Sequence, residues 1–245
     1  MFPLKDDIPT RTTPFVTIGL IALNVLVFLY QISLQGGGSP DGVRAARDFF
    51  FEFGLVPCRL TGTCTPVGGL LPPALTVFTS MFLHGGILHV GGNMLYLWIF
   101  GNNVEDTLGH ARFVVFYFVA GVAAAAAQVA WSATSSVPMI GASGAVSGVL
   151  GAYLLLFPRA NVLTVIVFGF FVRVVRIPAV FLLGFWFLVQ FLSGLATWGA
   201  PVPRGEAAGG EIAWFAHLGG FLAGMALLFV LRPRDPWARG PSRSW

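Results

Sequence analysis

The sequence predicts an all-α polytopic membrane protein, built as a bundle of six transmembrane helices. Hydrophobic residues make up 56% of the 245 residues and charged residues only 10%, whereas soluble proteins carry about 25% charged residues. Several stretches are also apolar over about 20 residues, the length that crosses a bilayer as a helix. The basic residues form no clustered face, so the composition argues against a nucleic-acid-binding protein.

The six predicted spans fill most of the chain and leave no room for a separate soluble domain. They are residues 15–34, 87–104, 113–130, 140–157, 177–195 and 211–231, with an N-terminal tail at 1–14 and a basic tail at 232–245. The first span is long enough to cross the bilayer and lacks a clear small-residue cleavage site. We therefore expect it to be an uncleaved helix.

Two stretches between the spans are unusual. The loop 35–76 is long and contains the aromatic run Asp48–Phe53, D-F-F-F-E-F, which favours a segment that lies in the membrane interface. Residues 161–172 are apolar but short for a span, and Arg159 and Arg173 bracket them. This second stretch is expected to be interfacial or re-entrant.

The two cysteines, Cys58 and Cys64, both lie in the long loop. They could close a small disulfide if the loop faces an oxidising compartment, and otherwise they are two free thiols. A metal site is not expected there, because no further ligands lie nearby.

The distribution of Lys and Arg predicts the orientation. Six spans place both termini on one side, and that side carries ten of the Lys and Arg residues against four on the other. Because an excess of Lys and Arg marks cytoplasmic segments, the termini are expected to be cytoplasmic.

The stretch Met139–Gly148, M-I-G-A-S-G-A-V-S-G, places the hydroxyl of Ser143 near the start of the fourth span. A polar group in an apolar span is costly and is a functional candidate by default. With this topology the second, fourth and sixth spans all enter from the outside. His89, Ser143 and His217 then lie within about 10 Å of the outer face, and Ser143 with His217 is the predicted pair.

Small residues predict that the fourth and sixth spans touch. Gly144 and Gly148 are four residues apart on one, and Gly220 and Gly224 on the other. Such small-xxx-small patterns let helix backbones approach closely. Glycines of this kind also serve packing alone, but here they flank the candidate pair.

The chemistry predicted for this pair is that of a Ser–His dyad. A serine hydroxyl becomes a strong nucleophile when a base removes its proton, and histidine serves as that base near neutral pH. No Asp or Glu lies beside Ser143 or His217 to orient the imidazole, so a triad is not expected. His89 and Asn93 share a helix face and, with the Ser143 backbone N–H, form a candidate oxyanion site. His84 precedes them by one turn.

Other chemistries fit less well. The chain has four histidines and no H-E-x-x-H motif, and its span interiors lack carboxylates, which argues against a metalloprotease. A haem protein would need paired histidines on facing helices. A small transporter would leave the outer cluster of polar groups unexplained. We expect neither a metal nor a cofactor.

The motifs at Gly141–Gly144 (G-A-S-G), His84–Asn93 (H-G-G-I-L-H-V-G-G-N) and Ala216–Gly224 (A-H-L-G-G-F-L-A-G) resemble those of the rhomboid intramembrane serine proteases. The resemblance covers nearly the whole chain. The opening Pro3–Thr10, P-L-K-D-D-I-P-T, is similar to that of bacterial members.

The resemblance implies hydrolysis of peptide bonds in or near the transmembrane segments of membrane-protein substrates. Ser143 would be the nucleophile and His217 the general base, with an oxyanion site at His89, Asn93 and the Ser143 amide. The supporting residues would be His84, Gly141, Gly144, Gly220 and Gly224.

The resemblance also implies a location and leaves one alternative open. The fifth span, 177–195, would be the lateral gate, and the site would open to the extracytoplasmic side of a bacterial cytoplasmic membrane. The alternative is a non-catalytic rhomboid-like membrane chaperone or binding protein. The sequence predicts no oligomeric state.

Overall fold

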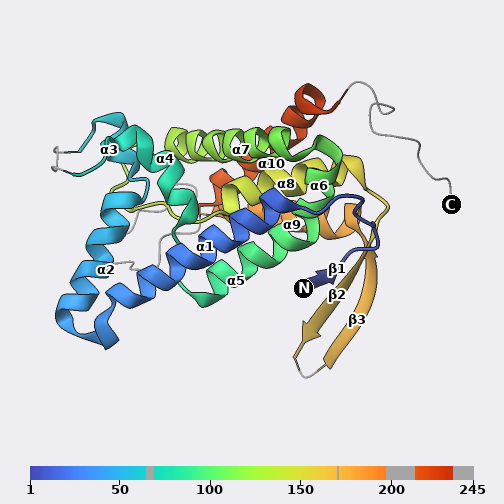
Figure 1. The fold of residues 1–245 in the computed structure, drawn as a ribbon, viewed down its shortest axis with the longest axis horizontal. Coiled ribbons are helices and arrows are strands. Elements are labelled where there is room, and N and C mark those ends of the chain that lie inside the picture. The colour runs from blue at the N-terminus through green and yellow to red at the C-terminus, as the bar shows by residue number, and fades with distance from the viewer. Residues whose placement is uncertain (65–68, 170, 197–212, 234–245) are drawn as a thin grey trace.

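Most of the chain is helical, as the sequence predicts (Figure 1). The computed structural model describes residues 1–64, 69–169, 171–196 and 213–233. The helices are α1 (Phe15–Leu34), α2 (Pro40–Phe53), α3 (Pro57–Thr61), α4 (Thr76–Thr79), α5 (Ile87–Tyr96), α6 (Asn102–Leu108), α7 (His110–Trp131), α8 (Ser143–Leu156), α9 (Ala179–Ala196) and α10 (Trp214–Leu231).

Four described helices, α1, α7, α9 and α10, are long and apolar enough to cross a bilayer. A fifth candidate span is a bent pair of helical segments, Pro73–Phe82 and Ile87–Leu108, which meet at 82° and pass the same test only when they are taken together. Within the second segment a π-helical turn joins α5 to α6. The chain is therefore a multi-pass membrane protein, and the predicted count of six depends on α8. Of the predicted final span and tail, residues 211–212 and 234–245 lie outside the described part.

Helix α8 is short and central. Its 14 residues span about 21 Å, less than the roughly 30 Å hydrocarbon core. Every residue from Ala145 to Tyr153 is buried, because α7 and α10 pack closely along it (Figure 1). A helix covered by protein on all sides need not match the bilayer thickness. Ser143 is the first residue of this helix.

A three-stranded antiparallel sheet, in the order β1-β2-β3, lies at the other end. Strand β1 is Phe2–Lys5, β2 is Asn161–Phe168 and β3 is Phe171–Pro178. The stretch 161–172, expected to be interfacial or re-entrant, thus forms β2 and the start of β3. A run of β-branched residues favours strand here, and Gly169, with φ +57°, lies at the turn.

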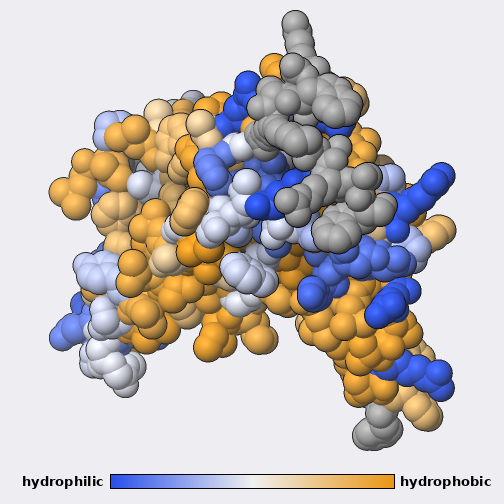
Figure 2. Space-filling view, turned by 45° about the vertical axis from the view of Figure 1, so that its right-hand side comes forward, coloured by the Kyte–Doolittle hydropathy of each residue, from blue (hydrophilic) through white to orange (hydrophobic). Residues whose placement is uncertain are grey.

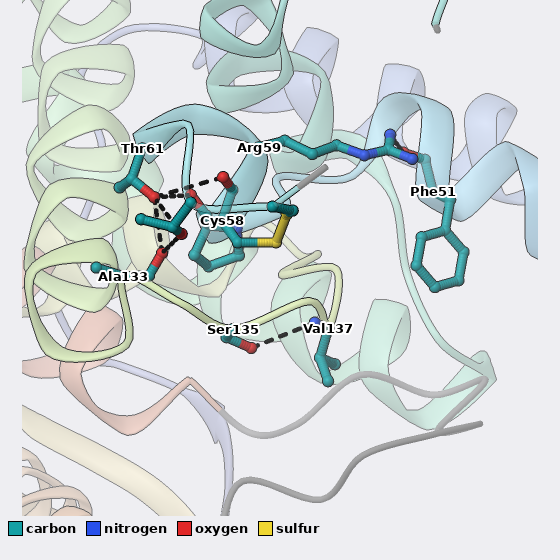
Figure 3. Close-up of a disulfide and its surroundings, with 10 residues drawn as sticks. Phe51, Cys58, Arg59, Thr61, Ala133, Ser135 and Val137 are labelled. Carbon is teal, nitrogen blue, oxygen red and sulfur yellow. Dashed lines mark hydrogen bonds between the residues drawn. A yellow bond between two sulfur atoms is a disulfide. The ribbon is translucent and has the colours of Figure 1, made fainter. Parts of the chain in front are cut away.

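The long loop after α1 contains a helix that the sequence analysis did not predict. Helix α2 begins after Ser39, whose Oγ accepts a hydrogen bond from the Gly42 N–H at 3.2 Å. The aromatic run lies in its last turns. Cys58 in α3 and Cys64 after it are joined in a disulfide (Figure 3). The sequence left open a disulfide or two free thiols, and the structure has the disulfide.

Carboxylates from α6 tie the N-terminal segment to the bundle. The buried carboxylate of Glu105 accepts hydrogen bonds from the backbone N–H groups of Val16 and Thr17 at 2.9 and 2.8 Å, and from Thr17 Oγ1 at 2.7 Å. These N–H groups belong to the first turn of α1 and have no partner within it. His110 Nδ1 lies 2.6 Å from the same carboxylate. Glu105 therefore caps α1 from another helix.

Two further carboxylates fix the segment that precedes α1. Asp6 Oδ2 is buried and accepts from Asn103 Nδ2 and Tyr153 Oη, both at 2.5 Å. Burial raises the pKa of Asp6 above its ordinary value. Asp7 accepts from the side chain and backbone N–H of Asn161, both at 2.8 Å, and these hydrogen bonds lower its pKa.

Candidate active site

Ser143 is the first residue of α8 and follows a backbone turn that needs glycine. Gly141 has φ +119°, in the region that disfavours a side chain, and its N–H donates to the Ser80 carbonyl at 2.9 Å. A Cβ at this position would also lie 2.7 Å from His89 Nε2. The glycine of the G-A-S-G motif thus orients the chain into α8 and leaves space for an imidazole beside it.

His217 lies in the first turn of α10, where residues of α7 hold the helix end. The Gln128 side-chain oxygen accepts from the Ala216 N–H at 3.2 Å, which caps a donor that the helix itself leaves free. The rings of Trp131 and Phe215 stack with centroids 3.9 Å apart. These contacts fix the start of α10 and therefore the position of His217.

The structure brings the predicted pair into contact. His217 Nε2 lies 2.8 Å from Ser143 Oγ, although the two residues are 74 positions apart in the chain. This distance is a normal hydrogen bond for a hydroxyl and an imidazole nitrogen. It is the arrangement in which a histidine can remove the serine proton.

The four glycines on α8 and α10 lie where the two helices cross. A Cβ on Gly220 would overlap the carbonyl oxygen of Gly144, and a Cβ on Gly224 would overlap that of Gly148. The backbones are thus in direct contact, with no room for a methyl group. This close approach sets the separation of the helix ends that carry Ser143 and His217.

The His89 ring lies against Gly141, which is two residues before Ser143. Its Nδ1 accepts a hydrogen bond from the Gly85 N–H at 3.4 Å. A neutral imidazole with Nδ1 as acceptor carries its hydrogen on Nε2, which is the atom that faces Gly141. His89 therefore offers a donor on the side of the ring near Ser143.

Asn93 and His84 are the two other residues predicted for the site. Asn93 is buried one turn after His89, and its Nδ2 has no hydrogen-bond partner among the described residues. His84 Nε2 accepts from the Ala142 N–H at 3.4 Å, and its backbone is paired with the Gln31 side chain. Asn93 thus holds a free donor, whereas His84 supports the turn before Ser143.

Gln190 on α9 is a site residue that the sequence analysis missed. Its Oε1 lies 2.6 Å from His217 Nδ1, and the side chain is buried. Gln190 is an amide and not one of the carboxylates that orient the imidazole in a triad. A polar side chain inside the fifth span was the available signal.

The long first loop is fastened to the segment that leads into Ser143. Thr61 Oγ1 donates to the Ala133 carbonyl at 2.8 Å (Figure 3), and the Cys58 N–H donates to the Ser135 carbonyl at 3.0 Å. Leu55 and Met139 exchange backbone hydrogen bonds at 3.1 and 2.8 Å. The disulfide-closed loop therefore supports one wall of the site.

A small cavity opens beside the Ser143 side chain. It is lined by polar Ser80 and by small or apolar residues that include Met139, Gly141 and Ala216. None of the residues that line this cavity is charged.

Comparison with known proteins identifies the family that these motifs resemble. The Rhomboid domain family matches residues 73–234. The chain is 32% identical over 160 residues to "Rhomboid protein 1, mitochondrial" of Saccharomyces cerevisiae, covering 62% of this chain and 40% of that protein. It is 41% identical over 78 residues to "Rhomboid protease GluP" of Bacillus subtilis, covering 32% and 15%.

A longer alignment joins the chain to "RHOMBOID-like protein 1" of Arabidopsis thaliana. The two are 27% identical over 237 residues, which is 90% of this chain and 54% of that protein. The chain thus spans about half or less of the length of the relatives it matches.

Proposed function

Because the chain belongs to the rhomboid family, we propose that it is a serine endopeptidase that cleaves peptide bonds in or near the transmembrane segments of other membrane proteins. The observation that carries the proposal is the 2.8 Å contact between Ser143 Oγ and His217 Nε2. The name of the Bacillus subtilis relative, a rhomboid protease, supports the same reaction class.

In the proposed reaction Ser143 Oγ attacks the peptide carbonyl carbon while His217 Nε2 takes the hydroxyl proton. The tetrahedral intermediate collapses as the imidazolium gives that proton to the leaving amine, and an acyl-enzyme remains. Water then repeats the sequence: His217 takes its proton, the hydroxide attacks the ester, and Ser143 recovers its hydrogen. No cofactor enters this scheme.

The peptide carbonyl oxygen gains negative charge as Ser143 attacks, and hydrogen-bond donors must face that oxygen to stabilise it. We assign this role to His89 Nε2–H, Asn93 Nδ2–H and the Ser143 backbone N–H. The free amide of Asn93 and the hydrogen on Nε2 of His89 support the assignment. Removing one such donor typically lowers kcat by a factor of about 10²–10³.

The location and orientation are also proposals. The excess of Lys and Arg on the side of the termini supports cytoplasmic termini and an extracytoplasmic site, and the opening motif supports a bacterial cytoplasmic membrane. Substrates would be single transmembrane segments that reach the site past α9, the proposed lateral gate.

The first experiment compares cleavage of a single-span reporter by the purified wild type, Ser143→Ala and Ser147→Ala. Ser147 is the matched control, because it is a serine one turn along the same helix whose Oγ donates to the Ser143 carbonyl at 2.6 Å. Wild type and Ser147→Ala should cleave, and Ser143→Ala should not.

Labelling with a fluorophosphonate separates a wrong substrate from a wrong function. A labelled wild type that leaves the reporter intact has a reactive serine and needs another substrate. If the wild type neither cleaves nor is labelled, the non-catalytic chaperone or binding protein replaces the protease.

A further inference from the structure

The imidazole of His217 is held from both sides. Its Nε2 faces Ser143 Oγ at 2.8 Å and its Nδ1 faces Gln190 Oε1 at 2.6 Å. An amide oxygen can only accept a hydrogen bond, so the hydrogen of the neutral ring lies on Nδ1. Nε2 is then left with the lone pair that a general base needs. Gln190 thus selects the useful tautomer.

We propose that Gln190 is a positioning residue for His217, supplying without charge the orienting contact that a carboxylate supplies in a catalytic triad. The proposal rests on the proposed function. When His217 takes the serine proton, the Nδ1–H donor becomes part of a cation, and its hydrogen bond to Gln190 strengthens. The contact therefore favours the charged state formed during the reaction over the resting state.

The other neighbours of the ring cannot replace this contact. Trp186 and Trp214 lie with ring centroids 5.9 and 6.4 Å from that of His217. Neither supplies an acceptor to Nδ1, since the indole nitrogen of tryptophan only donates. Trp186 is one turn before Gln190 on α9, which makes it a control for packing on the same helix face.

The test compares Gln190→Leu, Gln190→Glu and Trp186→Phe in the protein of 245 residues. Leucine keeps much of the volume and removes the acceptor, whereas glutamate keeps a side-chain oxygen. Fluorophosphonate labelling of Ser143 should slow by at least about tenfold in Gln190→Leu, the loss expected for one hydrogen bond to a charged group. Gln190→Glu should recover most of the rate, and Trp186→Phe should label nearly as the wild type does.

Nitrogen NMR of histidine-labelled protein gives a second readout that packing alone would not move. The wild type should show His217 with its hydrogen on Nδ1, and Gln190→Leu should show a mixture of tautomers. A Gln190→Leu variant with the wild-type tautomer and labelling rate would overturn the proposal. A wild type that is never labelled would refute the proposed function instead, while the tautomer still reports on Gln190.

A second, independent observation concerns the hairpin formed by β2 and β3. Its outer half carries large apolar side chains that are more than half exposed in the described protein. Phe168 and Phe171 are 81% and 75% exposed, and Val167, Val172 and Val174 are also exposed. Figure 2 shows the hairpin as a projecting, mostly hydrophobic prong with hydrophilic groups along one side.

The hairpin leaves the end of the bundle where α8 ends and α9 begins. In Figure 1 it runs across the direction of α7 rather than continuing it. Eight residues per strand make it about 26 Å long. The hairpin thus lies at the end of α8 away from Ser143.

The backbone of the hairpin limits how deeply it can enter the membrane. Strand β3 is an edge of the sheet, and open sheet edges are excluded from the hydrocarbon because their N–H and C=O groups would lack partners there. Arg173 and Arg176 on this strand are exposed and form no ion pair within the described residues. Water and lipid headgroups can satisfy both the edge and the guanidinium groups.

We propose that the β2–β3 hairpin is embedded in the lipid interface, with Phe168 and Phe171 at the acyl chains and the arginines on acidic headgroups. Aromatic and apolar side chains beside basic ones are typical of interfacial anchors. The hairpin leads directly into α9, so the anchor also fixes the start of the proposed gate helix at the surface.

The test places a fluorophore at Phe168→Cys in nanodiscs that hold one copy, made of phosphatidylcholine with or without phosphatidylglycerol. Cys58 and Cys64 are already bonded to each other, so the new thiol is the one labelled. Arg159→Cys, at the exposed base of the same hairpin, is the control. Doxyl lipids should quench the label at 168 more than that at 159, and aqueous iodide should do the reverse.

Acidic lipid should increase the quenching by doxyl lipids at 168, and Arg173→Gln with Arg176→Gln should remove that increase. A label that iodide reaches equally at both positions would place the hairpin in water and overturn the proposal. Protection that appears only in discs with two copies would identify a second chain as the partner and would also overturn it.

Discussion

Replacing Gly220 by alanine tests whether direct contact between α8 and α10 sets the geometry of the dyad. The new methyl group would overlap the carbonyl oxygen of Gly144 and lie 3.0 Å from its carbon. The position of the methyl group is fixed by the α10 backbone, and the carbonyl group belongs to the α8 backbone. No side-chain rotation therefore relieves the overlap, and the helices must separate. Overpacking of this kind costs about 1–3 kcal/mol, and we expect a value near the upper end.

The matched control is Gly19→Ala on α1, where a Cβ would meet nothing within 4 Å. Alanine favours either helix over glycine by about 1 kcal/mol, and this gain cancels between the two variants. Gly220→Ala should therefore be less stable than Gly19→Ala by about 3 kcal/mol, or roughly 6–12 °C in the midpoint of thermal unfolding for a chain of this size.

The assay measures thermal unfolding and fluorophosphonate labelling on the same samples. Gly220→Ala should lose stability and label slowly, because separating the helices lengthens the contact between Ser143 and His217. Gly19→Ala should keep both properties. A Gly220→Ala protein as stable and as reactive as its control would show that the crossing tolerates a methyl group, and the close-packing argument would fail.

Three other predictions follow from single contacts. His217→Ala should lose cleavage and labelling while unfolding at the wild-type temperature, because only the base is removed; labelling at the normal rate would exclude that role. Glu105→Gln should destabilise the protein by about 2 kcal/mol, since an amide presents N–H groups to donors of α1 that need an acceptor, and an unchanged unfolding midpoint would contradict the cap. Asp6→Asn and Asp7→Asn should act in opposite directions. Burial raises the pKa of Asp6, so its ionised form destabilises the folded state, and Asp6→Asn should be more stable than the wild type at neutral pH. The Asn161 hydrogen bonds lower the pKa of Asp7, so its ionised form stabilises the folded state, and Asp7→Asn should be less stable. The Asp6→Asn difference should vanish as the pH falls to 3.8, the ordinary pKa of the carboxyl group, whereas the Asp7→Asn difference should persist at that pH and vanish only as the pH falls through the lowered pKa of Asp7. Unfolding midpoints measured from neutral pH to well below 3.8 check this, and wild-type and variant curves that stay parallel throughout would contradict the reasoning.

The helical bundle and the pairing of Ser143 with His217 could be predicted because their signals are local. Apolar length identifies a crossing, and a hydroxyl or imidazole inside one stands out against lipid-facing neighbours. Ser143 and His217 also lie near the starts of two spans that were predicted to enter the membrane from the same side, which predicted that the two residues lie at a similar depth. The 2.8 Å contact itself depends on a helix crossing that the glycine spacing suggests but does not determine.

The hairpin was missed because a short apolar run does not distinguish a strand from a buried helix. Val162, Thr164, Val165, Ile166 and Val167 are all β-branched, which was the available evidence for a strand. Pairing of β1 with β2 joins the N-terminus to a stretch about 160 residues later, a contact that no local pattern carries. Helix α2 did carry a local signal, a serine N-cap followed by proline.

Gln190 changes how the proposed gate relates to catalysis. The acceptor for His217 Nδ1 lies on α9, whereas the serine and the histidine lie on α8 and α10, which are locked together by their glycines. If α9 moves aside to admit a substrate, it carries the acceptor away and leaves the imidazole free to adopt the inactive tautomer. The base is then fully prepared only when α9 has returned. Under the proposed function, a substrate that holds α9 open is cleaved about tenfold more slowly, the factor expected for loss of the Gln190 contact, because the imidazole then has the reactive tautomer only part of the time.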